Sequence, residues 1–296
     1  MADNRVITPG APRPSEVPFL SASAVPPPLE TRVQLSLADY AELMRELDEL
    51  RSRHRGELAQ RLRDARDFGS PGDADDRLAP LILELMATRR FDAPLIMEGG
   101  SIHTDGEGTL LSTEECLLNR NRNPSLSKAE IESYLRDYLG VDTFVWLKKG
   151  LPGDETDGHV DNIACFAAPG LVAMQAPSSD GNEEGDPLAE LSRAKDAAGR
   201  RLDIVPIPQP PERRCRGERL TLSYINYYPV SGGLVVPVFG KDGEATMRAS
   251  DDRALGILRE LYPDRKIVAV DGMKIIKGGG NVHCITQQIP AAGRRA

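Results

Sequence analysis

The sequence predicts an α/β fold in which a strand pair, a helix and one further strand recur along the chain. From about residue 95 onward, short apolar runs bounded by glycine, proline and aspartate turns alternate with amphipathic stretches, as expected for strands and helices that share one domain. The order strand pair, helix, strand returns at irregular spacing, which indicates a repeated module. With 296 residues, the chain is long enough to bury a sizeable core.

The first expected unit comprises two strands, a helix and a third strand. The two strands are expected over residues 93–103 and 108–118, on either side of the turn sequence TDGEG. Residues 127–140 are expected to form a helix that begins at a serine cap and ends at Gly140. The run TFVWL at residues 143–147 completes the unit as a strand.

Two further units follow in the second half of the chain. Residues 162–176 are expected to form a strand hairpin that turns at its central proline and glycine. Residues 176–200 are polar, so we expect a surface excursion there. The last unit has a strand over 232–239, a helix over 250–264 and a strand over 266–272.

The N-terminal quarter of the chain has a different composition. Residues 1–30 are rich in proline and have little to bury, so a disordered lead is expected. Between residues 31 and 78, apolar positions recur at three- and four-residue steps among dense charge, which predicts an amphipathic helical hairpin. Such a hairpin is either a solvated helix pair that packs on its own domain or a coiled coil that enters a partner. The α/β domain is then expected over residues 79–296.

Composition excludes several classes of protein. No run of 18 apolar residues occurs and the N-terminus lacks the features of a secretory signal, so we expect a cytoplasmic protein with no membrane-spanning helix. The four cysteines are widely separated, without a CxxC pair, which predicts reduced thiols rather than a disulfide scaffold or a zinc ribbon. A net charge of −8 disfavours nucleic-acid binding and favours cationic partners.

A histidine among carboxylates and a cysteine behind three glycines are the candidates for chemistry. His159 follows an acidic run that includes Glu155, and Asp161 lies two residues further on. Such neighbours favour the cationic imidazolium, a general acid near neutral pH. The glycines at 278–280 permit turns and close approach to a ligand just before Cys284. The alternatives are a solvated acidic loop for the histidine and a small hydrophobe beside a turn for the cysteine.

The spacing of these residues selects one type of chemistry. No histidine or cysteine pair has the spacing of a metal site, and KGGGNVH lacks the pattern of a nucleotide-binding loop, so neither ligand is predicted. Glu98 ends an apolar run and needs a partner if it is buried. Carboxylates match the planar N–H fork of a guanidinium. A thiol can attack its central carbon, while a histidine protonates the departing ammonia and then activates water.

Four segments of the chain are long and distinctive motifs: MEGGSIHTDGEGTLLSTEECLLNRNRNP, LPGDETDGHVDNIACF, SYINYYPVSGGLVVPVFG and KGGGNVHCITQQ. Through these motifs the chain closely resembles, over about residues 79–290, the agmatine deiminases of the peptidylarginine-deiminase-like family. The resemblance implies a partial pentein, an α/β propeller of ββαβ modules. It also implies conversion of agmatine to N-carbamoylputrescine and ammonia, in putrescine and polyamine biosynthesis, without a metal or an organic cofactor.

The resemblance also implies roles for individual residues. Cys284 matches the family's nucleophile, His159 its general acid and base, and Glu98 the acid of the Glu-Gly-Gly motif. Asp161 matches a carboxylate that binds the guanidinium. The glycines before the nucleophile would let its segment pass close to the substrate. Three further residues of the motifs are expected substrate contacts: Glu155, Asn226 and Gly279.

One family motif has no counterpart here. Agmatine deiminases carry a Trp-x-Arg-Asp-x-Gly-Pro stretch whose aspartate also binds the guanidinium, whereas the only tryptophan of this sequence, Trp146, lies in an expected strand. We therefore expect an incomplete pentein and weak activity.

The expected hairpin leads to a second hypothesis. Residues 31–78 weakly resemble the N-terminal coiled coil of Gre-type transcript-cleavage factors. The leading hypothesis is an agmatine deiminase-type hydrolase, with a homo-oligomer as one expected assembly. The alternative is a catalytically impaired chimera whose hairpin binds RNA polymerase or another protein.

Overall fold

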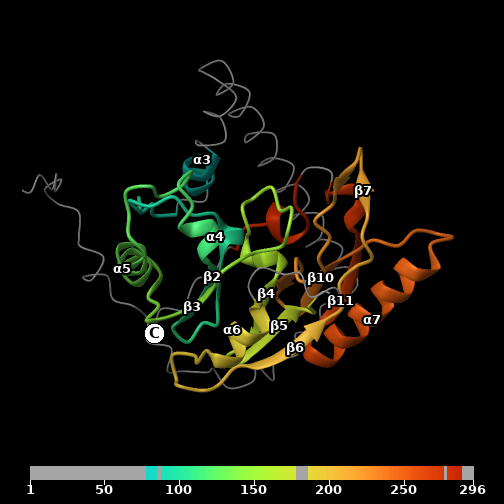
Figure 1. The fold of residues 1–296 in the computed structure, drawn as a ribbon. Helices are drawn as coiled ribbons and strands as arrows, with labels where there is room; N and C mark the ends of the chain where they lie inside the picture. The colour runs from blue at the N-terminus through green and yellow to red at the C-terminus, as the bar shows by residue number, and fades with distance from the viewer. Residues whose placement is uncertain (1–77, 86–87, 178–185, 277–278, 289–296) are drawn as a thin grey trace, which may run out of the picture. The chain divides into compact units, whose positions relative to one another are not determined.

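Figure 1 shows the computed structural model of the chain, which describes residues 78–85, 88–177, 186–276 and 279–288. The chain divides into two compact units at the boundary between Ala93 and Pro94. In the shorter unit, the described residues contain one helix, α3 (Leu78–Leu85). The predicted lead over residues 1–30 lies outside the described residues, and so does the predicted helical hairpin up to residue 77.

The described part of the larger unit contains three modules that share one plan: an antiparallel strand pair, a helix, and a strand parallel to the second strand of the pair. The first module has β1 (Ile102–Thr104), β2 (Thr109–Thr113), α5 (Lys128–Leu139) and β3 (Thr143–Leu147). The second has β4 (Ala164–Ala168), β5 (Leu171–Gln175), α6 (Pro187–Arg193) and β6 (Asp203–Ile207). The third has β9 (Tyr228–Val230), β10 (Gly233–Val238), α7 (Ala245–Leu261) and β11 (Lys266–Asp271). The predicted repeat of ββαβ modules is therefore present.

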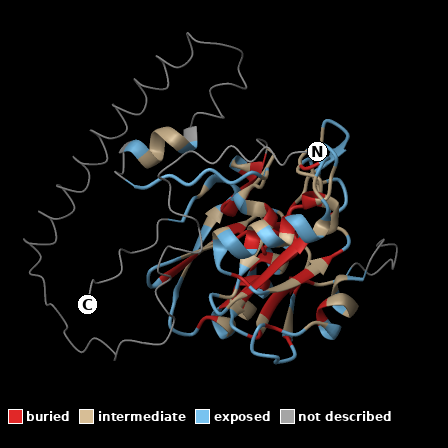
Figure 2. Ribbon diagram, turned by 90° about the vertical axis from the view of Figure 1, so that its left-hand side faces the viewer, coloured by how far each residue is buried: buried red, intermediate tan, exposed pale blue. Residues whose placement is uncertain are grey.

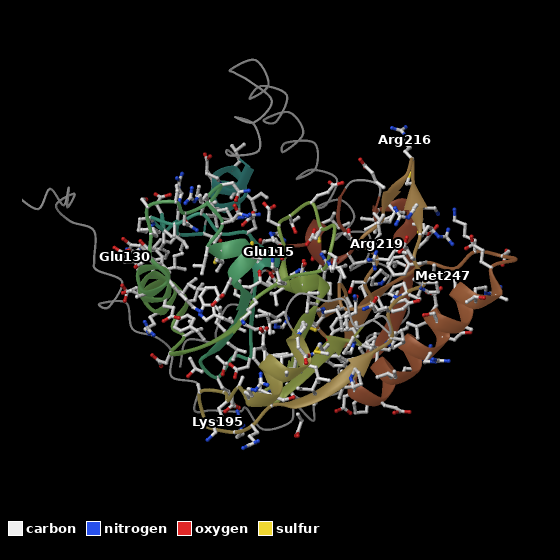
Figure 3. All side chains as sticks on the ribbon, viewed as in Figure 1. Glu115, Glu130, Lys195, Arg216, Arg219 and Met247 are labelled. Carbon is white, nitrogen blue, oxygen red and sulfur yellow. The ribbon has the colours of Figure 1, made fainter. Side chains whose placement is uncertain are left out.

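Two short elements are additions to this common plan. Helix α4 (Glu114–Leu117) follows β2 directly. A hairpin of β7 (Arg214–Cys215) and β8 (Glu218–Arg219) separates the second module from the third. Figure 3 shows Arg216 at the outer end of this hairpin.

The register of the strands determines where the segment that precedes each module's first strand lies. In each module the second strand is the central strand of a three-stranded sheet. The start of the first strand lies opposite the end of the second, as the pairs Ile102–Ser112 and Ala164–Met174 show. A segment that enters a module therefore arrives where the central strand ends.

Buried side chains form three apolar clusters along the described strands and helices. Figure 2 marks the buried residues in red on the ribbon. Leu110 of β2 packs in one cluster with Ile131 and Leu135 of α5, whereas its neighbour Leu111 packs in the next cluster. In β5, Ala173 likewise belongs to a different cluster from the residues on either side of it. Central strands that are buried on both faces need nearly continuous apolar sequences, which explains why these runs are visible in the sequence.

Local signals in the first two modules were sufficient to place a helix and a hairpin. The Ser127 side chain accepts a hydrogen bond from the backbone N–H of Glu130, whose carboxylate accepts one from the backbone N–H of Ser127, which is a capping box. Gly140 ends α5 in the left-handed conformation, at φ 66°. Gly170, at φ 76°, forms the turn between β4 and β5. The predicted helix and hairpin are confirmed at these positions.

Two predicted strands of the first module are too long. The strand predicted over residues 93–103 is wrong up to Ser101, because residues 93–98 form no strand, residues 99–101 form a 3₁₀ turn, and β1 begins at Ile102. The strand predicted over 108–118 ends at Thr113, where the threonine side chain accepts a hydrogen bond from the backbone N–H of Cys116, 3.2 Å away, and caps α4.

Two other predictions need correction in the later modules. The surface excursion predicted over residues 176–200 contains α6, which is capped by Asp186 and buries Leu191. A helix of seven residues is too short for its periodicity to stand out. The helix predicted over 250–264 begins earlier, at Ala245. None of the described helices is long and apolar enough to cross a membrane.

Candidate functional site

Five of the side chains predicted to be catalytic or to bind substrate lie just before or just after a module. Glu98 comes just before β1, His159 and Asp161 just before β4, and Asn226 just before β9, while Cys284 follows β11. Three short 3₁₀ turns form these segments: η2 (Gly99–Ser101), η3 (Val160–Asn162) and η6 (His283–Ile285). Because η2 packs against both η3 and η6, residues almost two hundred positions apart meet in one place.

A cavity of about 310 Å³ opens at this meeting point. The three residues predicted to be catalytic, Glu98, His159 and Cys284, all line it. The complete set of lining residues is Glu98, Gly99, Gly100, Thr156, His159, His283, Cys284, Thr286, Gln287 and Gln288. The volume is that of a small-molecule site.

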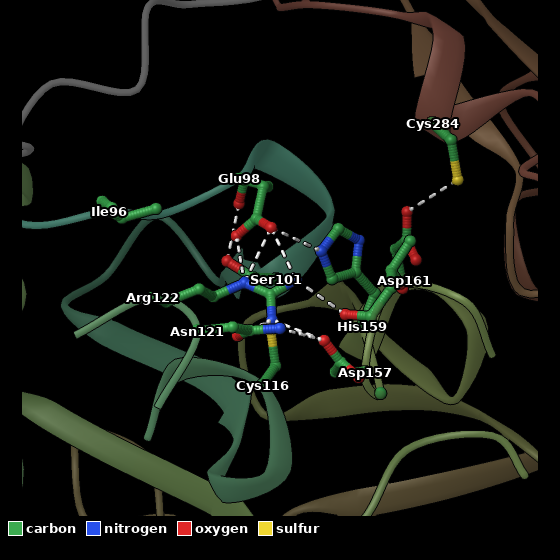
Figure 4. A network of polar contacts seen from close by, with 12 residues as sticks. Ile96, Glu98, Ser101, Cys116, Asn121, Arg122, Asp157, His159, Asp161 and Cys284 are labelled. Carbon is green, nitrogen blue, oxygen red and sulfur yellow. Dashed lines mark hydrogen bonds and ion pairs between the residues drawn. The ribbon is translucent and has the colours of Figure 1, made fainter. Parts of the chain in front are cut away.

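The thiol of Cys284 lies between a carboxylate and an amide. Its Sγ is 3.3 Å from Oδ2 of Asp161 (Figure 4), and it accepts a hydrogen bond of 3.2 Å from Nδ2 of Asn226. Although the residue as a whole is exposed, burial of the sulfur and the nearby charge of Asp161 raise the pKa of the thiol to about 11. In the absence of a ligand the thiol is therefore protonated at neutral pH.

His159 faces Glu98 across the cavity wall. Its Nε2 lies 3.7 Å from Oε1 of Glu98, and the histidine is 7% exposed. Burial alone would raise the pKa of Glu98, but its contacts with His159 and Arg122, with the charges of both groups, lower it to about 2. An ionised carboxylate thus stays beside the imidazole of His159.

Arg122 belongs to this network but was not predicted from the sequence (Figure 4). Its Nε donates to both carboxylate oxygens of Glu98, at 2.7 and 2.9 Å. Other guanidinium nitrogens bind Asp157 at 3.1 Å and the carbonyl oxygen of Thr156 at 2.8 Å. The arginine lies in the run NRNRNP between two helices, where no periodicity marks a buried position. The only signal in the sequence was Glu98, the acid of the Glu-Gly-Gly motif, which requires a partner if it is buried.

None of the four predicted substrate contacts, Asp161, Glu155, Asn226 and Gly279, is among the residues that line the cavity. Asn226 is fully buried, and its side chain binds Cys284, Asn162 and the backbone N–H of His283. Glu155 is exposed. The structure therefore places Asn226 beneath the thiol, as a support for the segment that carries it.

At the described glycines near the site, a side chain is disfavoured for different structural reasons. Gly279 adopts φ 90° next to Glu155, and a Cβ on Gly280 would lie 2.7 Å from Cβ of Cys284. A Cβ on Gly100 would lie 2.6 Å from Nδ1 of His159 and a similar distance from the Asp161 carboxylate. Such distances are far inside van der Waals contact, so the close packing requires glycine. Gly278, the first glycine of the triple run, lies outside the described residues.

One group of side chains has the composition of a metal site. Ligand atoms of Glu98, Cys116 and His159 lie within 4.8 Å of one another. However, the Glu98 carboxylate already binds the guanidinium of Arg122, so a divalent cation would be placed beside a fixed positive charge. Burial also raises the pKa of the Cys116 thiol to about 12, whereas a metal requires the thiolate. These residues therefore fit a metal ion poorly.

Comparison with known proteins identifies the family. The family model for the Porphyromonas-type peptidyl-arginine deiminase matches residues 67–290. The agmatine deiminase of Stutzerimonas stutzeri is 46% identical over 243 residues, which covers 73% of this chain and 63% of that protein. The agmatine deiminase of Ectopseudomonas mendocina is 44% identical over 245 residues, covering 75% of this chain and 64% of that one.

A solved structure supports the fold assignment. The agmatine deiminase of Enterococcus faecalis superposes with a TM-score of 0.65 at 38% identity, over 74% of this chain and 64% of that chain. Together with the three ββαβ modules, this similarity confirms the predicted α/β fold of a partial pentein. The chain spans less than two thirds of the length of each of these relatives. Because the family model covers most of the sequence, from residue 67 to residue 290, the chain belongs to the Porphyromonas-type peptidyl-arginine deiminase family.

Proposed function

We propose that this site hydrolyses the guanidinium group of agmatine to N-carbamoylputrescine and ammonia through a covalent intermediate on Cys284. The observation that carries the proposal is a pair of buried atoms that make no hydrogen bond. Oδ1 of Asp161 and Nε2 of His159 have no hydrogen-bond partner among the described residues, and Oε1 of Glu98, 3.7 Å from that Nε2, is beyond hydrogen-bonding distance. Buried polar atoms are nearly always paired, so an open acceptor on the carboxylate that contacts the Cys284 thiol and an open ring nitrogen on a residue that lines the cavity support a ligand with N–H groups.

A guanidinium suits this arrangement chemically. It is a planar cation with only hydrogen-bond donors, and the carboxylate of Asp161, 2% exposed, supplies the matching negative charge. The other oxygen of that carboxylate lies 3.3 Å from Sγ of Cys284. A guanidinium bound to Asp161 would therefore have its central carbon close to the sulfur.

Substrate binding also supplies the charge that the thiol needs. Without a ligand, the Asp161 carboxylate opposes formation of the thiolate, and the pKa of Cys284 is about 11. A guanidinium paired with Asp161 cancels that charge and adds a cation next to the sulfur, so it lowers the pKa of the thiol. The nucleophile is thus activated when the substrate is in place.

In the first half of the reaction, the thiolate of Cys284 forms a bond to the guanidinium carbon, and the C=N π electrons move to nitrogen. His159 in its cationic form donates its Nε2 proton to one amino nitrogen. The carbon–nitrogen bond then breaks and ammonia leaves. An S-alkylthiouronium remains on the cysteine.

In the second half, neutral His159 removes a proton from a water molecule that attacks the same carbon. The carbon–sulfur bond breaks, Cys284 leaves as the thiolate, the hydroxyl proton passes to solvent, and the product is a urea. One water is consumed, and one ammonia and one proton are released. His159 therefore serves as acid and then as base, beside the carboxylate of Glu98.

The choice of agmatine rests on the relatives and on the charge of the cavity. The curated relatives described above are agmatine deiminases. Among the described residues, those that line the cavity include the carboxylate of Glu98 and no lysine or arginine, which supports a substrate whose tail is not anionic. We also propose a cytoplasmic location, in keeping with four cysteines that are all free thiols.

The direct test is ammonia release from agmatine by the purified chain. We expect turnover that is lost in Cys284→Ala and retained in Cys215→Ala, which removes a thiol that is neither fully buried nor part of the site. Free arginine, whose carboxylate has no cation to meet in the cavity lining, should be the poorer substrate. Equal activity of Cys284→Ala and the parent chain would refute the mechanism.

A further inference from the structure

A buried histidine next to the nucleophile contacts the same carboxylate oxygen as the thiol. Nδ1 of His283 lies 3.0 Å from Oδ2 of Asp161, and Sγ of Cys284 lies 3.3 Å from that same oxygen. His283 is 8% exposed, and its backbone N–H donates to Oδ1 of Asn226 at 2.9 Å. His283 is therefore held by Asn226 through its backbone N–H and by Asp161 through its ring.

We propose that His283 is a positioning residue whose Nδ1–H holds the Asp161 carboxylate between the thiol and the substrate. An ionised carboxylate only accepts hydrogen bonds, so the contact requires the proton to be on Nδ1 of His283. That donor occupies Oδ2 and leaves Oδ1 of Asp161, which has no partner among the described residues, for the guanidinium. This inference extends the proposed function by assigning a role to a residue outside the predicted catalytic set.

The hydrogen bond has an electrostatic consequence for the nucleophile. A donor bound to Oδ2 withdraws part of the negative charge that faces the sulfur, so the thiolate is formed more easily than it would be beside a bare carboxylate. Burial and the charge of Asp161 already raise the pKa of this thiol to about 11. Loss of the His283 donor should therefore raise it further.

Among the described residues, the other rings near His283 do not donate a hydrogen bond to the Asp161 carboxylate. His103 packs 6.5 Å from it between ring centroids, and Tyr228 presents an edge at 6.2 Å. Burial and the nearby His283 lower the pKa of His103 to about 4, so that ring is neutral at pH 7. Its Nδ1 accepts a hydrogen bond from the backbone N–H of Phe166 at 3.2 Å. Among the described residues, His283 is the side chain that donates from a ring nitrogen to Asp161.

The experiment compares two replacements of the same shape. Asparagine and leucine have the same branching, but in His283→Asn an amide N–H can occupy the position of the Nδ1–H, whereas His283→Leu has no donor. The pKa of Cys284 is measured from the pH dependence of its alkylation by iodoacetamide, followed by peptide mapping. We expect His283→Leu to raise that pKa by about one to two units, the effect of one charge-assisted hydrogen bond. His283→Asn should stay within about half a unit of the parent chain.

A second background tests whether the effect passes through the carboxylate. Asp161→Asn removes the charge, so the pKa of the thiol should fall, and adding His283→Leu to Asp161→Asn should cause no further rise. His283→Ala replaces His283→Leu should the leucine variant not fold. Equal thiol pKa values for the asparagine and leucine variants, or an equal rise in both backgrounds, would overturn the proposal. Alkylation needs no turnover, so these outcomes stand apart from those of the agmatine assay.

Discussion

Arg122 explains how a carboxylate in the wall of the cavity keeps its charge. Burial by itself raises the pKa of a carboxyl group, yet the pKa of Glu98 falls to about 2 because His159 and Arg122 both bind its ionised form. The arginine side chain is only 8% exposed and is held on its other side by Asp157. The imidazole of His159 thus lies beside a carboxylate that Arg122 holds in place.

The Arg122→Met variant should lose stability in a way that depends on pH. The pKa of Glu98 is lowered from 4.5 to about 2 in the folded chain, so the ion pair stabilises the fold above pH 4.5, and this contribution is lost as pH falls toward 2. Without Arg122, the loss of charged hydrogen bonds should cost about 1.5–3 kcal/mol at neutral pH. The free energy of unfolding, measured with urea, should therefore differ most at pH 7 and converge in acid.

The matched control is Arg120→Met, which changes an exposed arginine two residues away and should be nearly neutral. A difference between Arg122→Met and the parent chain that is the same at every pH would mean that Glu98 is not the partner that matters.

At the scale of elements, the site depends on where modules begin rather than on the strands themselves. The turns η2 and η3 belong to different modules, yet they pack so closely that Gly100 has no room for a Cβ beside His159 and Asp161. Neighbouring Gly99 is far less confined, since a Cβ there would meet its nearest atom, Oε1 of Gln287, at 3.9 Å. The two glycines of one motif therefore have different roles.

Gly100→Ala should impair catalysis while Gly99→Ala should not. A methyl group 2.6 Å from Nδ1 of His159 must displace the imidazole or the carboxylate of Asp161, and a shift of about 1 Å in a reacting group can cost roughly 100-fold in rate. The measurement is kcat/KM for agmatine, together with thermal unfolding to confirm that both variants fold. Similar kcat/KM values for the two alanine variants would show that η2 and η3 tolerate separation.

The strands and long helices could be predicted because their signals are local, whereas the site could not be derived from local signals alone. TFVWL, the hairpin around Gly170 and the capping box at Ser127 each carry enough information within a dozen residues. Arg122 and His283 act through partners 24 and 122 positions away, and no periodicity marks them. The motif resemblance assigned roles to Cys284, His159, Asp161 and Glu98. The structure alone brings Cys284, His159 and Glu98 to one cavity and places the Asp161 carboxylate 3.3 Å from the thiol.

At the scale of the whole molecule, the described chain provides three modules and a cavity formed where they begin. One carboxylate with an open oxygen, that of Asp161, lies next to the nucleophile among the described residues, while Glu98 is already paired with Arg122. The relatives are longer, and this chain spans 64% of the Enterococcus faecalis enzyme. The Trp-x-Arg-Asp-x-Gly-Pro motif, from which the resemblance to agmatine deiminases implies a further guanidinium-binding aspartate, does not occur in this sequence.

We therefore expect the 296-residue chain to deiminate agmatine far more slowly than a full-length relative assayed beside it. A guanidinium taken out of water needs compensation of its charge and acceptors for its N–H groups, and one carboxylate satisfies only part of that requirement. Loss of one partner of a desolvated charge pair costs about 2 to 5 kcal/mol, which corresponds to a roughly 30- to 5,000-fold lower kcat/KM. The measurement is ammonia release by the chain, its Cys284→Ala variant and the Enterococcus faecalis enzyme at equal concentrations. If the chain matches that enzyme and the alanine variant is inactive, then Asp161 alone provides sufficient charge compensation and the second carboxylate is dispensable here.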